Sequence, residues 1–489
     1  MIAVILAFAA AETAALPARD NQRANELRFG LLSEPATLDP LSPSNTADGR
    51  SLLFNVYEGL VKPDPSGRLI PAAAESYEIS SDGKTYSFIL RQGLLFHDSS
   101  PLLAADVEFT LNEAAKAGFF GFTNIERITI TGDRRIEIKL KETDPEFLSN
   151  LTIGIVPKNN PDREGNPIGS GPFRIESYNP QQNITLVKNP HYRTAGLPKL
   201  DRVTGVFSAD YNALYTSLAG GNINGAMVPG DIMEKLVQSN YDVTESYSNS
   251  IQLLALNNAV KPFDDVRVRQ AVNFAVNKQE IIDTAFYGRG RPTGSPLIPG
   301  LALYYNETLR DPYPYNTARA RALLAEAGLP DGFSIEIKIP SNYAMHIDTG
   351  QVLVNQLARA GIRATIRLVD WATWLSDVYY GRNYEATIIS LDSNTISPSG
   401  FLSRYVSSSG SNFINFTSQR YDTLYRELLT EINEERRIGL YREAQKIISD
   451  EAASVYIQDI FAFTVFSGGF RGTVNYPLYV MDFSVIYRD

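Results

Sequence analysis

The chain has 489 residues, of which 44% are hydrophobic and 20% charged, enough to bury large cores in more than one lobe. Its formal net charge of −10 argues against a nucleic-acid-binding protein, because such proteins normally present a basic face. It contains no cysteine, which excludes a disulfide framework, a thiolate metal site and a cysteine nucleophile.

The N-terminal segment has the pattern of a secretory signal peptide. Residues 1–16 form an apolar, alanine-rich run that is too short to span a bilayer. Ala7, Ala9 and Ala11 offer cleavage positions of the A-x-A type, although the usual positive residues before the apolar run are missing. We therefore expect a signal peptide over residues 1–20 and a periplasmic mature protein. Because no cysteine can carry a lipid, we expect that protein to be free and not lipid-anchored.

The first part of the chain is predicted to be rich in β-strands. Apolar and polar residues alternate on both sides of turn signals such as Ser81-Asp82-Gly83-Lys84, a pattern typical of hairpins. Helices are indicated where a capping residue precedes apolar residues at helical spacing. The expected strands are residues 27–32, 75–80, 85–90, 125–131, 135–140, 173–178, 184–188, 200–207 and 223–227, and the expected helices are residues 48–59, 104–115 and 211–218.

A strand, two capped helices and a proline-rich exit follow one another within residues 253–299. The strand is a short apolar run, and Asp264 or Asp265 can cap the first helix. Asn277 begins the second helix, and Glu280 three residues later completes a capping box. We interpret this stretch as scaffold at the joint between two parts of the chain, with few ligand contacts.

Strands and helices alternate in the second part of the chain. This alternation indicates an α/β lobe with at least one parallel pair of strands. Ligands usually bind in the crevice between two such lobes. The expected helices are residues 317–327, 349–360, 371–380, 420–431 and 435–451, and the expected strands are residues 333–339, 362–368, 386–390, 454–466 and 478–487.

Four motifs, in a fixed order, carry a resemblance to a known family. They are SSDGKTYSF at residues 80–88, GSGPF at 169–173, VRVRQAVN at 266–273 and AGLP at 327–330. The chain resembles the family 5 extracellular solute-binding proteins, the peptide- and nickel-binding components of ABC importers. The resemblance extends from about residue 27 to the C-terminus.

The resemblance implies an α/β, two-lobed periplasmic-binding-protein fold, with a hinge between the lobes and an extra subdomain in lobe I. Lobe I is then expected at residues 26–255 with the subdomain at about 56–168, lobe II at 256–465, and a return to lobe I at 466–489. The implied activity is the capture of a solute, for which we expect an oligopeptide. The implied partners are the membrane permease and ATPase subunits of an ABC importer, and we expect a monomer that binds no nucleic acid.

Asp392 is the residue for which we expect the most direct contact with a ligand. It follows the predicted strand at residues 386–390, and ligands collect at such strand ends in open α/β sheets. In aligned peptide binders of the family, an Asp at this position pairs with the α-ammonium group of the ligand. A buried carboxylate is costly unless it is paired, and a cationic ligand group supplies that pair. The alternative is an Asp that only caps a turn.

The resemblance implies further ligand contacts around the same cleft. Tyr343 follows a predicted strand at a position that faces the cleft in relatives, and the loop at residues 407–413 borders the cleft in the family. That loop is rich in serine, so it can bind a peptide backbone or simply be solvated. Arg404 can meet a ligand carboxylate or pair with an acidic side chain on the surface. The expected ligand-binding residues are Asn342, Tyr343, Asp392, Asn394, Arg404, Ser411 and Asn412.

Two narrower specificities of the family lack their signatures here. Dipeptide binders carry an Arg near the position of Tyr343, and nickel binders carry a His in the loop at residues 407–413, but neither is present. A strict dipeptide or nickel specificity is therefore not expected. Binders of another solute, such as an oligosaccharide, an opine-like compound or a metal chelate, stay open as alternatives.

No enzyme motif is found in its required context. Gly83-Lys84-Thr85 resembles the end of a phosphate-binding loop but lies in a predicted hairpin turn. The three histidines are not spaced like a pair of metal ligands. We expect no catalytic residue, no metal and no cofactor, and a secreted hydrolase is the alternative from another functional class.

Overall fold

The computed structural model describes residues 25–32, 34–45, 47–119, 121–236, 241–393, 396–478 and 480–489. The signal peptide expected at residues 1–20 lies outside this part of the chain. Within the described ranges, we find no helix with the length and apolar character needed to cross a membrane.

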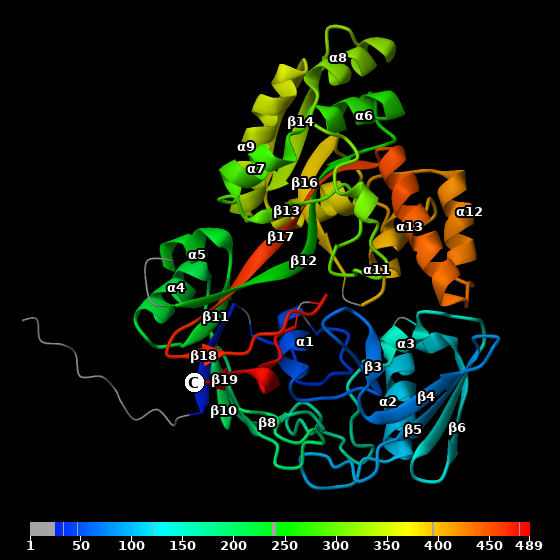
Figure 1. The fold of residues 1–489 in the computed structure, drawn as a ribbon, viewed down its shortest axis with the longest axis vertical. Helices are drawn as coiled ribbons and strands as arrows, with labels where there is room; N and C mark the ends of the chain where they lie inside the picture. Colours follow the sequence, from blue (N-terminus) through cyan, green and yellow to red (C-terminus); the bar gives the residue numbers. More distant parts are fainter. Residues whose placement is uncertain are drawn as a thin grey trace, which may run out of the picture.

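Two bodies are connected by one long sheet, which Figure 1 shows running from the upper body into the lower one. Its strand order is β15-β14-β16-β12-β17-β11-β1-β10-β9-β8, and β13 pairs with β17 outside this path. The strands are β1 (Glu26–Leu31), β8 (Phe173–Asn179), β9 (Asn183–Lys188), β10 (Arg202–Phe207), β11 (Gly225–Val228), β12 (Asp242–Leu256), β13 (Gly290–Pro292), β14 (Phe333–Pro340), β15 (Ile362–Val369), β16 (Ala386–Asp392) and β17 (Ser454–Phe466).

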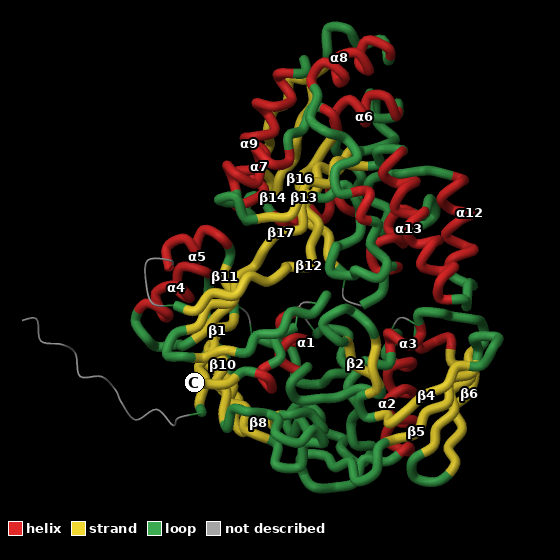
Figure 2. The backbone as a smooth tube through the Cα atoms, in the orientation of Figure 1, coloured by secondary structure: helices red, strands yellow, loops and turns green. Residues whose placement is uncertain are grey.

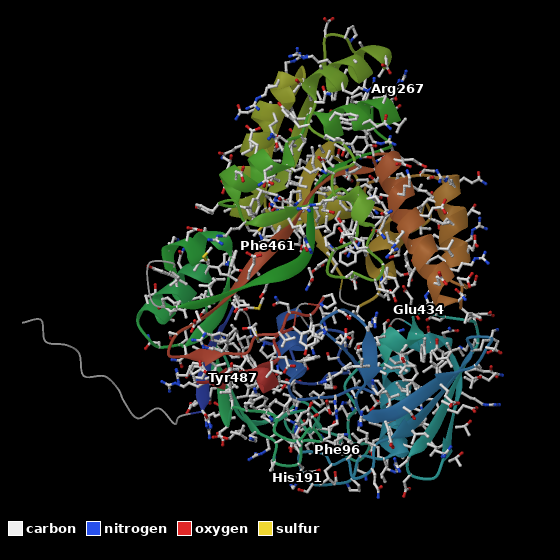
Figure 3. The ribbon with its side chains drawn as sticks, viewed as in Figure 1. Phe96, His191, Arg267, Glu434, Phe461 and Tyr487 are labelled. Atoms are coloured by element: carbon white, nitrogen blue, oxygen red, sulfur yellow. The ribbon has the colours of Figure 1, made fainter. Side chains whose placement is uncertain are left out.

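The antiparallel strands β12 and β17 cross from one body to the other. Their lower ends pair with each other and, through β17, with β11, while the upper half of β12 pairs with β16 from Ser250 to Leu256. Phe461, labelled in Figure 3, lies in β17 along this crossing. The register shifts between Tyr247 and Ile251, so the two strands are irregular at the crossing.

The strand predicted from the sequence at this crossing is shorter than β12. Apolar periodicity marked only residues 253–256, whereas β12 has 15 residues. Its first half, from Asp242, is mostly polar and gains its regular structure from pairing with β17, a contact between segments about 200 residues apart.

The upper body is an α/β unit, and Figure 2 shows its helices against the strands. β14 is parallel to both β15 and β16, so the predicted parallel pair is confirmed. The side chain of Asp265 caps one predicted helix and that of Asn277 caps the next, as expected from the sequence. The helices are α6 (Val266–Phe274), α7 (Lys278–Ala285), α8 (Thr317–Glu326), α9 (Ala344–Arg359), α10 (Trp371–Thr373), α11 (Ser399–Leu402), α12 (Gln419–Leu428) and α13 (Glu434–Asp450).

The lower body combines its part of the long sheet with a four-stranded antiparallel sheet of order β4-β5-β7-β6. The hairpins predicted in this part of the sequence are confirmed, because β4 pairs with β5, β6 with β7 and β8 with β9. Further elements are α1 (Ala47–Leu53), β2 (Val61–Pro63), β3 (Leu69–Pro71), β4 (Ala74–Ile79), β5 (Thr85–Leu90), α2 (Ala104–Lys116), β6 (Ile125–Thr131), β7 (Arg135–Leu140), α3 (Phe147–Asn150), α4 (Tyr211–Ala219) and α5 (Gly230–Leu236).

Each body has its own buried cores. The four-stranded sheet packs its inner face on α2 in one core that includes Tyr86 and Phe147, and the upper body has two cores, one of which lies under α9. Separate cores give two bodies that can move relative to one another about the strands that join them. The expected lobe limits, near residues 255 and 465, stay predictions.

The prediction of a strand at residues 478–487 is wrong. The structure has a 3₁₀ turn at Phe483–Val485 and a two-residue strand β19 (Tyr487–Arg488), which pairs with β18 (Phe470–Arg471). Asp482 caps the turn by accepting a hydrogen bond from the backbone N–H of Ser484 at 2.9 Å. This local side-chain contact competes with strand formation.

Candidate functional site

A cleft of about 980 Å³ lies between the two bodies. The lower body supplies most of its wall, while the upper body contributes Tyr343, Asp392, Ser393 and Ile396. The polar and charged lining residues are Asn45, Arg50, Glu58, Lys62, Ser149, Asn150, Thr152, Asn249, Asp392, Ser393, Asp482 and Ser484, and the aromatic ones are Phe54, Tyr57, Phe119, Phe122, Tyr192, Tyr211 and Tyr343. The size is at the upper end of the range for small-molecule sites.

Asp392 is the last residue of β16, and it is exposed and lines the cleft. Its backbone carbonyl accepts a hydrogen bond from Arg404 Nη2 at 3.0 Å. Its carboxylate has no hydrogen-bond or ion-pair partner among the described residues, so it is available to a cation in the cleft.

Tyr343 lies immediately before α9 and also lines the cleft. Its ring packs edge-on against Trp371, with 5.7 Å between the ring centroids. Trp371 in turn stacks on Trp374 at 5.1 Å with the two planes 4° apart. Tyr343 is therefore the cleft end of a row of aromatic rings, which is favourable for contact with planar or apolar ligand groups.

Four of the other expected ligand contacts, all within the described residues, do not line the cleft. Asn342 is exposed and lies outside the cleft. Arg404 also lies outside it and donates a hydrogen bond to the backbone carbonyl of Asp392. Ser411 forms its contact with Ser409, at 2.9 Å between the hydroxyl oxygens. Asn412 is buried, and its amide nitrogen donates to two backbone carbonyls of its own loop. Asn394 lies outside the described residues.

A buried ion pair supports the lower wall of the cleft. Arg193 donates to both carboxylate oxygens of Glu58 at 2.9 Å, and the Tyr192 hydroxyl donates to one of them at the same distance. Burial alone would lower the pKa of Arg193, but the charge and hydrogen bonds of Glu58 outweigh it and raise that pKa. Both oxygens of the Glu58 carboxylate are therefore bound inside the protein.

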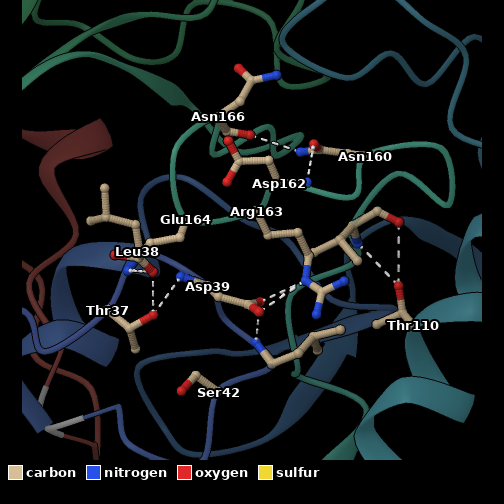
Figure 4. Close-up of polar contacts among 12 residues, drawn as sticks. Thr37, Leu38, Asp39, Ser42, Thr110, Asn160, Asp162, Arg163, Glu164 and Asn166 are labelled. Atoms are coloured by element: carbon tan, nitrogen blue, oxygen red, sulfur yellow. Dashed lines mark hydrogen bonds and ion pairs between the residues drawn. The ribbon is translucent and has the colours of Figure 1, made fainter.

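A second polar network fixes the segment that precedes α1 (Figure 4). Arg163 Nε lies 2.9 Å from each carboxylate oxygen of Asp39, and the backbone N–H of Leu38 donates to Glu164 at 2.9 Å. These bonds tie the segment to a loop more than 100 residues away. Pro40, which lines the cleft, is held in place by them.

The lower wall was missed by sequence reasoning. Glu58 and Lys62 lie in a segment that was assigned no ligand contact, and Asn150 belongs to a short helix that was not expected. The only available signal was the cluster of charged and turn-forming residues after position 58, which is also typical of an ordinary surface loop.

The described part of the chain contains no cluster of metal ligands. Among the described residues, no group of three or more His, Cys, Asp or Glu side chains is arranged to hold a metal ion. Of the histidines, His346 is a buried residue of α9, and burial lowers its pKa to about 4.

Comparison with known families decides the class of the protein. The model of the bacterial extracellular solute-binding proteins, family 5 Middle, matches residues 68–413. The chain belongs to this family. The resemblance found in the sequence is thus confirmed, and this solute-binding protein is the substrate-binding component of an ABC importer.

Its relatives bind different solutes. Glutathione-binding protein GsiB of Pectobacterium atrosepticum is 31% identical over 379 residues, which cover 74% of this chain and 73% of that protein. Heme-binding protein A of Haemophilus influenzae is 28% identical over 467 residues, which cover 86% of this chain and 85% of that protein.

The two-lobed periplasmic-binding-protein fold is confirmed by solved structures. The ABC transporter substrate binding protein CtaP of Listeria monocytogenes is similar with a TM-score of 0.86 and 24% sequence identity, over 95% of this chain and 99% of that chain. The upper and lower bodies are therefore the two lobes of this fold.

Proposed function

We propose that this solute-binding protein captures an oligopeptide between its two lobes and delivers it to a membrane permease that works with an ATPase. The observation that carries the proposal is the Asp392 carboxylate at the cleft, which has no hydrogen-bond or ion-pair partner among the described residues. A peptide α-ammonium group is a cation that can pair with it through a charge-assisted hydrogen bond.

The remaining cleft chemistry supports a peptide ligand. Amide and hydroxyl side chains such as Asn45, Asn150 and Thr152 can bond to backbone groups of a peptide, and seven aromatic residues can contact its side chains. GsiB, named as a glutathione-binding protein, is a relative whose ligand is itself a tripeptide.

Haem is the competing cargo suggested by the second relative. Iron in haem is held by side chains such as His, Met, Cys or Tyr. No His, Met or Cys is among the described residues that line the cleft, although tyrosines are. The cleft chemistry therefore favours the peptide over haem.

Ligand binding is proposed to shift an open–closed equilibrium, because only the closed state contacts the ligand from both lobes. The proposed lobes are residues 26–255 with 466–489, and residues 256–465. Micromolar affinity, about 8 kcal/mol, suits a carrier that must later release its cargo. We also propose that the protein binds without turnover, as a free monomer in the periplasm.

Native mass spectrometry of the protein purified without refolding tests the cargo. A co-purified mass that fragments into amino acids supports the peptide proposal, and a sugar, haem or other non-peptide mass contradicts it. Titration calorimetry with trialanine and with hemin provides the second measurement. Mass spectrometry of trialanine after incubation with the protein tests turnover, and hydrolysis lost on cleft mutation would contradict a binding-only role.

A further inference from the structure

We propose that Lys62 binds a free carboxylate of the ligand, so that the cleft selects a cargo with both a free amino and a free carboxyl end. This proposal rests on the peptide function proposed above. It adds a second charged ligand contact, from the opposite lobe to Asp392, at a position to which sequence reasoning assigned no role.

Lys62 is placed in the cleft wall by a rigid part of the lower lobe. It is the middle residue of β2, where it pairs with Ile70 of β3 while both of its neighbours in the strand are buried. The backbone N–H of Val61 also bonds to the carbonyl of Leu151 at 3.4 Å. The Lys62 side chain is half-buried and lines the cleft.

The ammonium group of Lys62 has no ion-pair or hydrogen-bond partner within the described ranges of the chain. Besides Asp392, the acidic side chains that line the cleft in the described part of the chain are already engaged. Glu58 lies four residues earlier, but both of its carboxylate oxygens are bound by Arg193. Asp482 accepts hydrogen bonds from Tyr476 and from the backbone of Ser484.

Lys62 and Asp392 therefore form a pair of opposite charges on the two walls of one cleft, and neither has a partner in the part of the chain that the structure describes. When the lobes close, each charge loses water, and burying a charge without a partner is costly. A peptide with free termini compensates both charges at once, since its ammonium meets Asp392 and its carboxylate meets Lys62. A ligand that lacks one terminal charge leaves one of the two side chains buried and unpaired.

Among the described residues that line the cleft, Arg50 is the other cation, but its guanidinium is already engaged. Its Nη1 donates to the backbone carbonyl of Asn45 at 2.7 Å, and it has a further interaction. Its guanidinium is thus held by the segment before α1. Lys62 is the cation that lacks such a restraint and can follow a ligand as the cleft closes.

Titration calorimetry of the full-length mature protein with three probes tests the proposal: trialanine, trialanine amide and N-acetyl-trialanine. The wild-type protein is expected to bind trialanine at least about tenfold more tightly than its amide, because the amide cannot form the charge-assisted hydrogen bond to Lys62. Lys62→Met should remove this preference, Lys62→Arg should keep most of it, and Lys188→Met, an exposed lysine on β9, should change nothing. Thermal unfolding of each variant checks that it is folded.

The acetylated probe separates the two ends of the site. Lys62→Met is expected to leave the discrimination against N-acetyl-trialanine intact, because that terminus is assigned to Asp392. Equal affinity of the wild type for trialanine and its amide overturns the Lys62 assignment while leaving the peptide function in place, and so does an amide discrimination that survives in Lys62→Met. If no probe binds the wild type, the peptide function is overturned, and the assignment of Lys62 with it.

Discussion

Arg291 and Asp459 form an ion pair of 3.1 Å at the strands that join the two lobes. Arg291 lies in β13 directly opposite Asp459 in β17, and Asp459 is also opposite Ile251 in β12. The Asp459 side chain is fully buried, whereas 28% of the Arg291 side chain is exposed. Burial raises the pKa of Asp459 to about 6, although Arg291 acts in the opposite direction.

This pair predicts a pH-dependent cost of removing Arg291. Between about pH 4 and pH 6 the folded carboxyl group keeps a proton that the unfolded one has released, so the group lowers stability as the pH rises through this window. Without Arg291 the pKa of Asp459 rises further. Arg291→Met should therefore lower the free energy of unfolding by about 3 kcal/mol at pH 8 and by clearly less at pH 5. Urea unfolding at the two pH values measures both numbers.

Arg289 provides a matched control for that experiment. It pairs with Glu234 at 3.0 Å, and both side chains are 36% exposed. Arg289→Met is expected to cost less than about 1 kcal/mol at either pH, since exposed ion pairs contribute little. An equal loss for Arg291→Met at pH 5 and pH 8 would contradict the raised pKa of Asp459.

Asp392→Asn is expected to weaken the binding of trialanine by more than about 1.5 kcal/mol, the lower range for a hydrogen bond to a charged group. The substitution keeps the size of the side chain and removes the charge proposed to meet the ammonium group. Titration calorimetry gives the affinity. Asp331→Asn, at an exposed residue of the same lobe, is the control and should bind like the wild type. Unchanged affinity of Asp392→Asn removes Asp392 from the site.

Arg404 is expected to act on binding through Asp392. Arg404→Met removes the 3.0 Å hydrogen bond to the carbonyl of Asp392 and leaves its carboxylate in place. We expect affinity for trialanine to fall by about 1 kcal/mol, less than for Asp392→Asn. In the double variant the two effects should not add, because both concern one contact. Full additivity in calorimetry argues that Arg404 meets the ligand independently.

Glu58→Gln is expected to destabilise the lower lobe. Only 7% of the Glu58 side chain and 15% of the Arg193 side chain are exposed, so the substitution leaves a largely buried guanidinium without its counter-charge. The expected loss is about 3 kcal/mol in the free energy of unfolding. Chemical denaturation measures it. Glu75→Gln is the control, because Glu75 pairs with Arg134 where 56% and 40% of the side chains are exposed. If Glu58→Gln lowers the free energy of unfolding no more than Glu75→Gln does, the prediction is contradicted.

Glu146 and Tyr441 connect the two lobes on the side away from the crossing strands. The Tyr441 hydroxyl donates to the Glu146 carboxylate, which also accepts from the backbone N–H of Ser399 at 3.4 Å. Glu434, at the start of α13, marks the same region in Figure 3, where this helix approaches the lower lobe. The contact therefore belongs to the interlobe arrangement seen in this structure.

Tyr441→Phe is expected to broaden the distribution of interlobe distances in the ligand-free protein. Since the chain has no native cysteine, spin labels can be attached at Thr131→Cys and Ala322→Cys, exposed positions in the two lobes. Double electron–electron resonance then reports the distances with and without trialanine. Tyr380→Phe, at a residue that is 72% exposed, is the control and should leave the distribution unchanged. An unaltered distribution in Tyr441→Phe shows that this contact does not restrain the lobes.

The elements that sequence predicted correctly depend on short-range signals. Asp265 and Asn277 cap their helices because the accepting side chain and the free N–H lie within three residues. The hairpin at residues 80–85 follows from a turn sequence between two alternating runs. The family motifs are equally local, which is why class and fold could be predicted from the chain alone.

The errors occur where distant segments decide the outcome. The polar first half of β12 becomes a strand only because β17 lies beside it, and residues 480–482 are not a strand because Asp482 caps a turn. Asn412 has the chemistry of a ligand contact, yet folding buries it and engages its amide with nearby carbonyls. No local pattern contains that information.

The sequence by itself determined that this is a two-lobed solute-binding protein and that Asp392 follows a strand end, since both depend on motifs and periodicity along the chain. Only the tertiary structure decided that Arg404 donates to the backbone carbonyl of Asp392 and that Lys62 lies on the other wall of the same cleft. The physical reason is that Lys62 and Asp392 are 330 positions apart, and only the packing of two separately folded lobes around β12 and β17 brings them to one cavity.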